Sequence, residues 1–147
     1  MTARLEERLF ANRLMRTPEE AKAFDAAVQE VVGVEGLDLR ALLRVFDDKC
    51  AHHEVMWGLI HLVEHFPVEA YVAAILDEAE HLALVAAEWL DTMLARLLND
   101  SATATVLANR LRSAQAETRL QLRPILVAIS KSTAPGASRA TALLDLR

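Results

Sequence analysis

The sequence predicts an all-α protein on three observations. The chain of 147 residues contains only 4 glycines and 4 prolines. Runs of β-branched residues are almost absent, and VVGV at 31–34 is the exception. Leucine and alanine recur at the three- and four-residue spacing that gives a helix an apolar face. These patterns predict antiparallel helix hairpins, stacked either as a small HEAT-like solenoid or as a compact helical bundle.

Capping residues predict where several helices begin and end. Thr17, Pro18 and Glu20 form a capping box with proline in the first helical position, so a helix starts there. Asp38 opens a later helix. Pro67 ends another, because the residue before a proline is pushed out of the helical region. The expected helices cover residues 3–15, 17–32, 38–46, 51–65, 67–80, 83–98, 102–114 and 117–131.

The length predicts one domain. A chain of 147 residues buries about 68–70% of its unfolded surface, so it needs no metal or disulfide to fold. From residue 38 the helices fall into three hairpins, at 38–65, 67–98 and 101–131. The tail at 132–147 is expected to be loose apart from a short amphipathic helix in ALLDLR. The chain 1–147 is therefore predicted to be a single all-helical domain.

Charge is distributed unevenly along the chain. The net charge is −2 in residues 1–37, −8 in residues 38–100 and +5 in residues 101–147. An acidic middle argues against nucleic acid as the main partner, because phosphate binding needs a basic surface. It favours a basic protein partner, although acidic surfaces also serve solubility.

The cysteine content and hydropathy indicate a cytoplasmic protein. Cys50 is the only cysteine, so the chain has no internal disulfide, which suits a reducing compartment. The first residues mix acids and bases and lack the apolar core of a signal peptide. Apolar runs are far too short to cross a bilayer. We expect no membrane partner.

The segment HLVEH at 61–65 matches H-x-x-E-H, a pattern in which two histidines hold zinc and the glutamate activates water. His61 and His65 are four residues apart and can share a metal on one helix face. The third ligand is missing, because Glu54 is displaced by about 10.5 Å along the helix axis. We therefore expect no metal, no cofactor and no catalytic residue. A zinc hydrolase is the least favoured of three functional hypotheses.

A helical wheel drawn for residues 52–66 places the histidines and acids on the face away from the core. Trp57 lies in the middle of this polar arc, which is the composition of a protein-binding hot spot. The alternative is that another helix packs over Trp57, since tryptophans are usually well buried. The polar arc contains His53, Glu54, Trp57, Gly58, His61, Glu64 and His65.

The helix expected at 83–98 is apolar over more than half of its circumference, which predicts a central position. Arg96 falls inside that apolar arc. Because an unpaired buried charge is very costly, Arg96 needs a carboxylate partner. We expect an ion pair with Asp47, Asp48 or Glu64.

Three segments form a distinctive combination: VFDDKCAHHEVMWGLIHLVEHFP at 45–67, YV at 71–72 and EWLDTMLARLLND at 88–100. In this combination the chain resembles the immunity protein 30 family of bacterial polymorphic-toxin systems. The resemblance covers roughly residues 38–130. It implies a small all-α protein that is not an enzyme. Such a protein binds the C-terminal domain of a cognate toxin and so prevents self-intoxication.

The leading hypothesis is therefore an immunity protein that neutralises a basic toxin domain by stoichiometric binding. The second is a HEAT-like helical adaptor or homodimer without a toxin partner. The resemblance does not separate motif residues that touch the toxin from those that hold the fold. The residues expected to bind the partner are Asp47, Asp48, Glu54, Trp57, His61 and Glu64. Those expected to be structural are Phe46, Trp89, Arg96 and Asn99.

Overall fold

The computed structural model describes residues 4–146, and no strand occurs among them. Helices make up 71% of the structure, which confirms the all-α prediction. None of the helices within the described range is long and apolar enough to cross a membrane. The helices are α1 (Leu5–Ala11), α2 (Pro18–Glu30), α3 (Leu39–Leu43), α4 (His53–Val63), α5 (Val68–Asp77), α6 (Ala79–Val85), α7 (Ala87–Leu98), α8 (Ser101–Ser113), α9 (Ala116–Ser130) and α10 (Ala137–Leu144).

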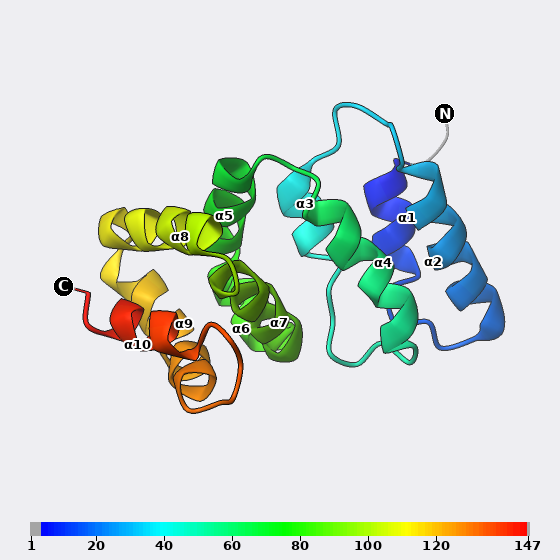
Figure 1. The fold of residues 1–147 in the computed structure, drawn as a ribbon. Helices are drawn as coiled ribbons and strands as arrows, with labels where there is room; N and C mark the ends of the chain where they lie inside the picture. Colours follow the sequence, from blue (N-terminus) through cyan, green and yellow to red (C-terminus); the bar gives the residue numbers. More distant parts are fainter. Residues whose placement is uncertain (1–3, 147) are drawn as a thin grey trace.

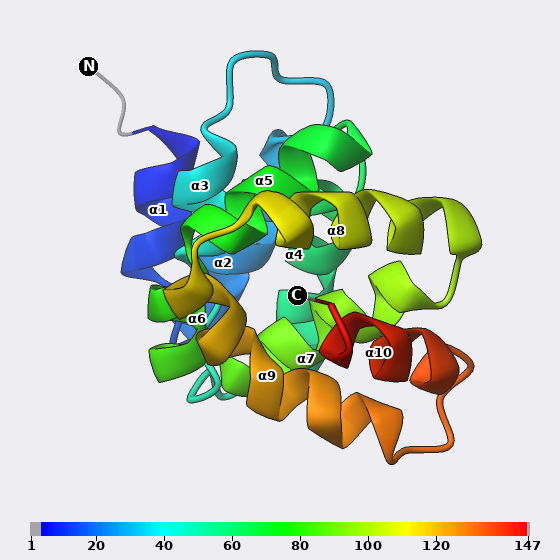
Figure 2. The same ribbon diagram turned by 90° about the vertical axis from the view of Figure 1, so that its left-hand side faces the viewer.

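Figure 1 shows α1 to α4 gathered on one side of the molecule and α5 to α10 on the other. In the first group, α2 packs against α1 and α4, and α3 connects the groups by packing against α5. In the second, α8 packs against α5 and α7, whereas α9 packs against α6, α7 and α10 (Figure 2). The stacked hairpins expected from the sequence are therefore not confirmed, because α8 and α9 each pack mainly on other helices.

The capping residues act as expected at two helix starts. The Thr17 hydroxyl accepts a hydrogen bond from the Glu20 backbone N–H at 3.1 Å. The Glu20 carboxylate accepts one at 2.9 Å from the N–H of Arg16, so the reciprocal bond of the capping box is displaced to the residue before the N-cap. Asp38 accepts from the Ala41 N–H at 3.2 Å and starts α3. These bonds satisfy backbone donors that have no partner within the helix.

The predicted helix at 83–98 is wrong in one respect, because the structure divides this region into α6 and α7. Ala86 lies between them with φ −142° and ψ 41°, outside the helical region. The backbone N–H of Asp48 donates to the carbonyl oxygen of Val85 at 3.0 Å, at the end of α6. The loop that contains Asp48 therefore contacts the backbone where the predicted helix is interrupted.

The same aspartate caps the start of α7. The Asp48 carboxylate accepts hydrogen bonds from the backbone N–H groups of Glu88 and Trp89 at 3.1 and 3.3 Å. These are the second and third residues of α7, whose N–H groups an N-cap side chain normally satisfies. Asp48 therefore supplies from a distance the cap that Ala86, with its methyl side chain, lacks. The break between α6 and α7 thus coincides with the hydrogen bonds of Asp48.

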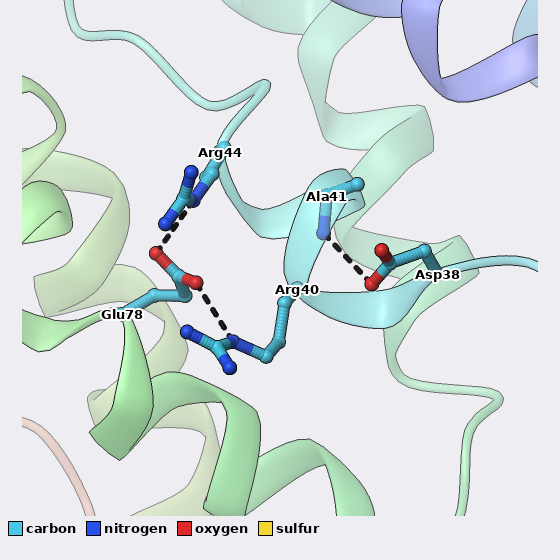
Figure 3. Close-up of polar contacts among 5 residues, drawn as sticks. All are labelled: Asp38, Arg40, Ala41, Arg44 and Glu78. Carbon is cyan, nitrogen blue, oxygen red and sulfur yellow. Dashed lines mark hydrogen bonds and ion pairs between the residues drawn. The ribbon is translucent and has the colours of Figure 1, made fainter.

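A buried carboxylate connects α3 to the start of α6. Glu78 is 3% exposed and accepts a hydrogen bond from Nε of Arg40 and another from Nε of Arg44, each at 2.8 Å (Figure 3). Each oxygen of Glu78 thus has its own guanidinium partner. Because both carboxylate oxygens are paired, the burial of this charge is compensated.

The C-terminal tail, in which a short helix is expected in ALLDLR, contains α10 from Ala137 to Leu144. This helix begins at Ala137 and packs against α9, with Ala140 and Leu143 buried. Gly136 allows the close approach, since a Cβ atom there would lie 2.6 Å from Cβ of Leu98 and 2.8 Å from its backbone. Arg139 donates a 2.7 Å hydrogen bond to the Leu98 carbonyl oxygen. The tail thereby supplies a hydrogen-bond donor to the carbonyl oxygen of the last residue of α7.

Candidate partner-binding site around Trp57

An aromatic cluster joins α4, α7 and the loop before α4. Trp89 is 3% exposed and lies at its centre. Its ring centroid is 5.6 Å from Phe46, 5.2 Å from His53 and 5.8 Å from Trp57. The two tryptophans meet edge to face, a favourable arrangement of aromatic rings. Trp57 in turn lies 6.1 Å from His61, so the cluster runs from the core to the surface of α4.

Asp47 faces the interior of the fold. It is 9% exposed, and its backbone carbonyl accepts a 3.2 Å hydrogen bond from Nε1 of Trp89. Its carboxylate accepts a 2.8 Å bond from the Lys49 N–H and lies 3.7 Å from Nε of Arg13. Asp48 caps α7, and its carbonyl oxygen accepts from Nε2 of His53 at 3.2 Å. Both aspartates, expected at the partner interface, thus make contacts that position the cluster.

The ion pair expected for Arg96 is present, and its partner is Glu64. Nε and Nη2 of Arg96 donate to the two oxygens of Glu64 at 2.6 and 2.8 Å. This hydrogen bonding raises the pKa of the Arg96 guanidinium above its usual value. The guanidinium carbon also lies 5.5 Å from the Trp57 ring centroid. The pair therefore holds α7 against α4 beside the tryptophan.

The expectation that Arg96 is buried in the apolar arc is wrong, since its side chain is 39% exposed. A long arginine stem can follow an apolar surface while its charged end reaches the edge. Asn99, also expected to be structural, is the exposed C-cap residue of α7, and its backbone N–H bonds to the carbonyls of Ala95 and Arg96.

The outer face of α4 carries the remaining expected contacts. Glu54 and His61 are exposed, and Trp57 is half-buried under Trp89 and Arg96. The Glu54 side chain is 75% exposed and lies 3.3 Å from Nδ1 of His52. Asp48 and Glu64 are also partly exposed, but their carboxylates are bound by groups of α7. Glu54, Trp57 and His61 are therefore the expected contacts whose outer surface is not tied up in this way.

The HLVEH segment is arranged differently from a zinc site. Nδ1 of His65 donates a 2.6 Å hydrogen bond to the carbonyl oxygen of His61, within the same helix turn. Glu64, which the motif would use to activate water, is engaged by Arg96. Across residues 4–146 the structure brings together no group of three or more side chains of the ligand-forming types.

Comparison with protein families gives a match over the region that contains this site. The sequence profile of the family described as Immunity protein 30 matches residues 11–107. The chain belongs to this family. The match contains the whole aromatic cluster and extends further toward the N-terminus than the resemblance at 38–130. Neither the curated proteins nor the solved structures include a match to the chain.

A groove beside α4, which the sequence did not predict, lies within the matched region. The groove has a volume of about 350 Å³ and lies between the end of α2 and α4. Val32 on the edge of this groove is 75% exposed, which is unusual for valine. The sequence signal for the groove is this apolar residue directly before Gly33, which follows α2 with a positive φ. The groove is lined by Val28, Gln29, Val32, Gly33, Gly58, His61, Leu62 and His65.

Proposed function

We propose that this member of the Immunity protein 30 family binds the C-terminal domain of a cognate toxin and neutralises it by stoichiometric contact. It acts in the cytoplasm and catalyses no reaction of its own. Family membership over residues 11–107 carries the proposal. The single free cysteine agrees with a reducing compartment.

The proposed contact surface is the outer face of α4. Trp57 offers a rigid aromatic surface, and Glu54 and His61 surround it with exposed polar groups. An aromatic side chain in the middle of a polar rim is the composition typical of binding hot spots. The ring is also held in one orientation by Trp89 and Arg96. A side chain fixed before binding loses less conformational freedom in the complex.

The other expected residues support this surface in our proposal. Glu64 fixes Arg96 beside Trp57. Asp47 and Asp48 fix Trp89, against which Trp57 packs. Their substitution is expected to weaken toxin binding indirectly, through a displaced aromatic cluster.

The proposed partner is basic. Residues 38–100 carry a net charge of −8 and include the whole of α4. Opposite charges accelerate association, and this acceleration decreases as salt is added. We therefore expect the association rate with the toxin domain to fall with ionic strength, while dissociation changes less.

The test uses the toxin domain encoded beside this gene, co-expressed with the full chain. The wild type is expected to co-purify with that domain and restore growth, and Trp57→Ala is expected to weaken binding by at least about tenfold. Glu54→Gln should reduce the association rate, whereas Glu117→Gln, an exposed acid beyond the family match, serves as the matched control. Full binding by a folded Trp57→Ala variant would exclude the proposed surface. Failure of the wild type to neutralise the toxin would exclude the function.

A further inference from the structure

One exposed apolar side chain on α6 has an exposed acid four residues before it and another four residues after it in the sequence. Leu84 is 82% exposed, more than any other large apolar residue of the described chain. Glu80 precedes it by one helical turn and Glu88 follows it at the start of α7, and both are exposed. Neither carboxylate forms an ion pair with any of residues 4–146. We call Glu80, Leu84 and Glu88 the acidic knob.

A groove of opposite character lies at the C-terminal end. It has a volume of about 280 Å³ and is bounded by the end of α8, by α9 and by α10. Leu120 on its wall is 67% exposed. Arg119 and Arg123 lie one helical turn apart on its rim, and neither guanidinium has an ion-pair partner within residues 4–146. We call this the basic groove; its lining is Leu111, Ala116, Arg119, Leu120, Arg123, Leu126, Leu143, Leu144 and Leu146.

We propose that the acidic knob of one copy binds the basic groove of a second copy. The groove is large enough for a leucine side chain and is lined mainly by apolar residues. The two surfaces match in charge, since two unpaired carboxylates would meet two unpaired guanidiniums, which can bind carboxylates through two parallel hydrogen bonds. Burying Leu84 and Leu120 removes two of the largest exposed apolar side chains from water.

The charge along the chain favours the same pairing. Residues 38–100, which contain the knob, carry −8, and residues 101–147, which contain the groove, carry +5. If a two-fold axis relates the two copies, the knob of each copy binds the groove of the other. Two equivalent contacts then form, and the assembly closes as a dimer. The groove lies beyond residue 107, outside the matched family region. Dimerisation is therefore a property distinct from the proposed toxin contact at Trp57.

The first experiment is sedimentation equilibrium of the purified full chain between about 1 µM and about 1 mM, a range of weak to moderate affinities. We expect a monomer–dimer equilibrium that shifts toward monomer as salt increases, because the proposed contact contains four charges. A single-chain mass over the whole concentration range at low salt overturns the proposal. In that case the groove is left to a different occupant.

Point variants then locate the interface. Leu84→Lys removes the apolar contact and places a cation opposite Arg119 and Arg123, so dimer affinity should fall by at least about tenfold. Val32→Lys is the matched control, because Val32 is 75% exposed and lies outside both surfaces. Circular dichroism and thermal melting check that both variants fold. Equal dimerisation by Leu84→Lys and Val32→Lys would overturn the assignment.

A charge exchange gives the most specific test. One variant carries Glu80→Arg and Glu88→Arg, so its knob and groove are both basic; the other carries Arg119→Glu and Arg123→Glu, so both are acidic. Each variant alone should be monomeric because like charges meet. Mixed in equal amounts, they should form a heterodimer with attraction at both contacts. A mixture that stays monomeric, while the wild type dimerises, would show that these charges do not meet.

Discussion

The loop before α4 and the outer face of α4 are neighbours in sequence but differ in what they contact. In the loop, Asp47 accepts hydrogen bonds from the Lys49 backbone N–H and from the indole of Trp89 in α7. Asp48 accepts from the backbone N–H of Glu88 in α7. On α4, the Glu54 carboxylate lies 3.3 Å from Nδ1 of the exposed His52. An acidic side chain is therefore part of the fold at positions 47 and 48 and open to solvent at position 54. A contiguous acidic motif here contains two physically different groups.

The physical reason is the need to pair backbone groups. The first N–H groups of α7 have no partner within the helix, and Ala86 cannot cap them. Asp48 satisfies two of them, and so its carboxylate is not available for a partner. Glu54 lies in the first turn of α4, where an acid is favoured by the helix dipole without being held in place. The following predictions test this division.

The largest expected effect is at Trp89. Trp89→Ala should lower the free energy of unfolding by about 3–5 kcal/mol, because a buried indole is lost from the cluster with Phe46 and Trp57. Denaturant unfolding monitored by circular dichroism measures this change. Trp89→Phe keeps most of the packing and removes the bond to the Asp47 carbonyl, so it should cost less. Equal stability of wild type and Trp89→Ala would contradict a central role for this residue.

The next effect concerns Cys50 in the same loop. Burial raises the pKa of this thiol from 9.0 to about 11. The folded state therefore keeps its proton at a pH where the unfolded state loses it. Stability from this group is complete below pH 9, decreases as pH rises and is lost above the folded pKa, a change of about 2–3 kcal/mol.

Cys50→Ala is the control for this pH dependence. The difference in unfolding free energy between wild type and variant, measured from pH 8 to pH 11, isolates the thiol from other titrating groups. The wild type should lose stability more steeply than the variant above about pH 9. Parallel pH curves would show that Cys50 is accessible to water, in disagreement with its 4% exposure.

A smaller effect is expected at Asp48. Asp48→Ala leaves the N–H groups of Glu88 and Trp89 without their cap and should cost about 1–2 kcal/mol. Asp38→Ala, which removes a cap of the ordinary local kind from α3, is the comparison. Thermal unfolding of both variants measures the two costs. If Asp48→Ala keeps full stability but loses toxin binding, Asp48 belongs with the outer face of α4 instead.

The smallest effect on stability is expected at Glu54. Glu54→Gln should change the free energy of unfolding by no more than about 0.5 kcal/mol, because the side chain is 75% exposed. Its effect should appear instead as slower, less salt-dependent association with the toxin domain. A large loss of stability in this variant would remove the contrast between the two regions.

Much of the fold follows from local patterns, and the site follows only partly. Helix periodicity predicts most helices, and Thr17 and Asp38 start theirs as expected. The wheel for α4 places Glu54 and His61 outside, as observed. It does not show that Trp57 is partly covered by α7, because a wheel contains no information about neighbouring helices. For the same reason, local patterns do not predict that the Asp48 carboxylate caps α7.

The sequence by itself determined the helical class, the cap-defined helix starts, the outward face of α4 and, through its motif, the Immunity protein 30 family. The first three of these features depend on residues within a few positions of each other, and the family on a combination of segments that can be read without their arrangement in space. Only the tertiary structure decided that α6 and α7 separate at Ala86, that Arg96 pairs with Glu64 instead of Asp47 or Asp48, and that the tail packs as α10. Each of these depends on a contact between distant segments, where unpaired backbone groups, charges and close packing select one arrangement among several that the local pattern allows.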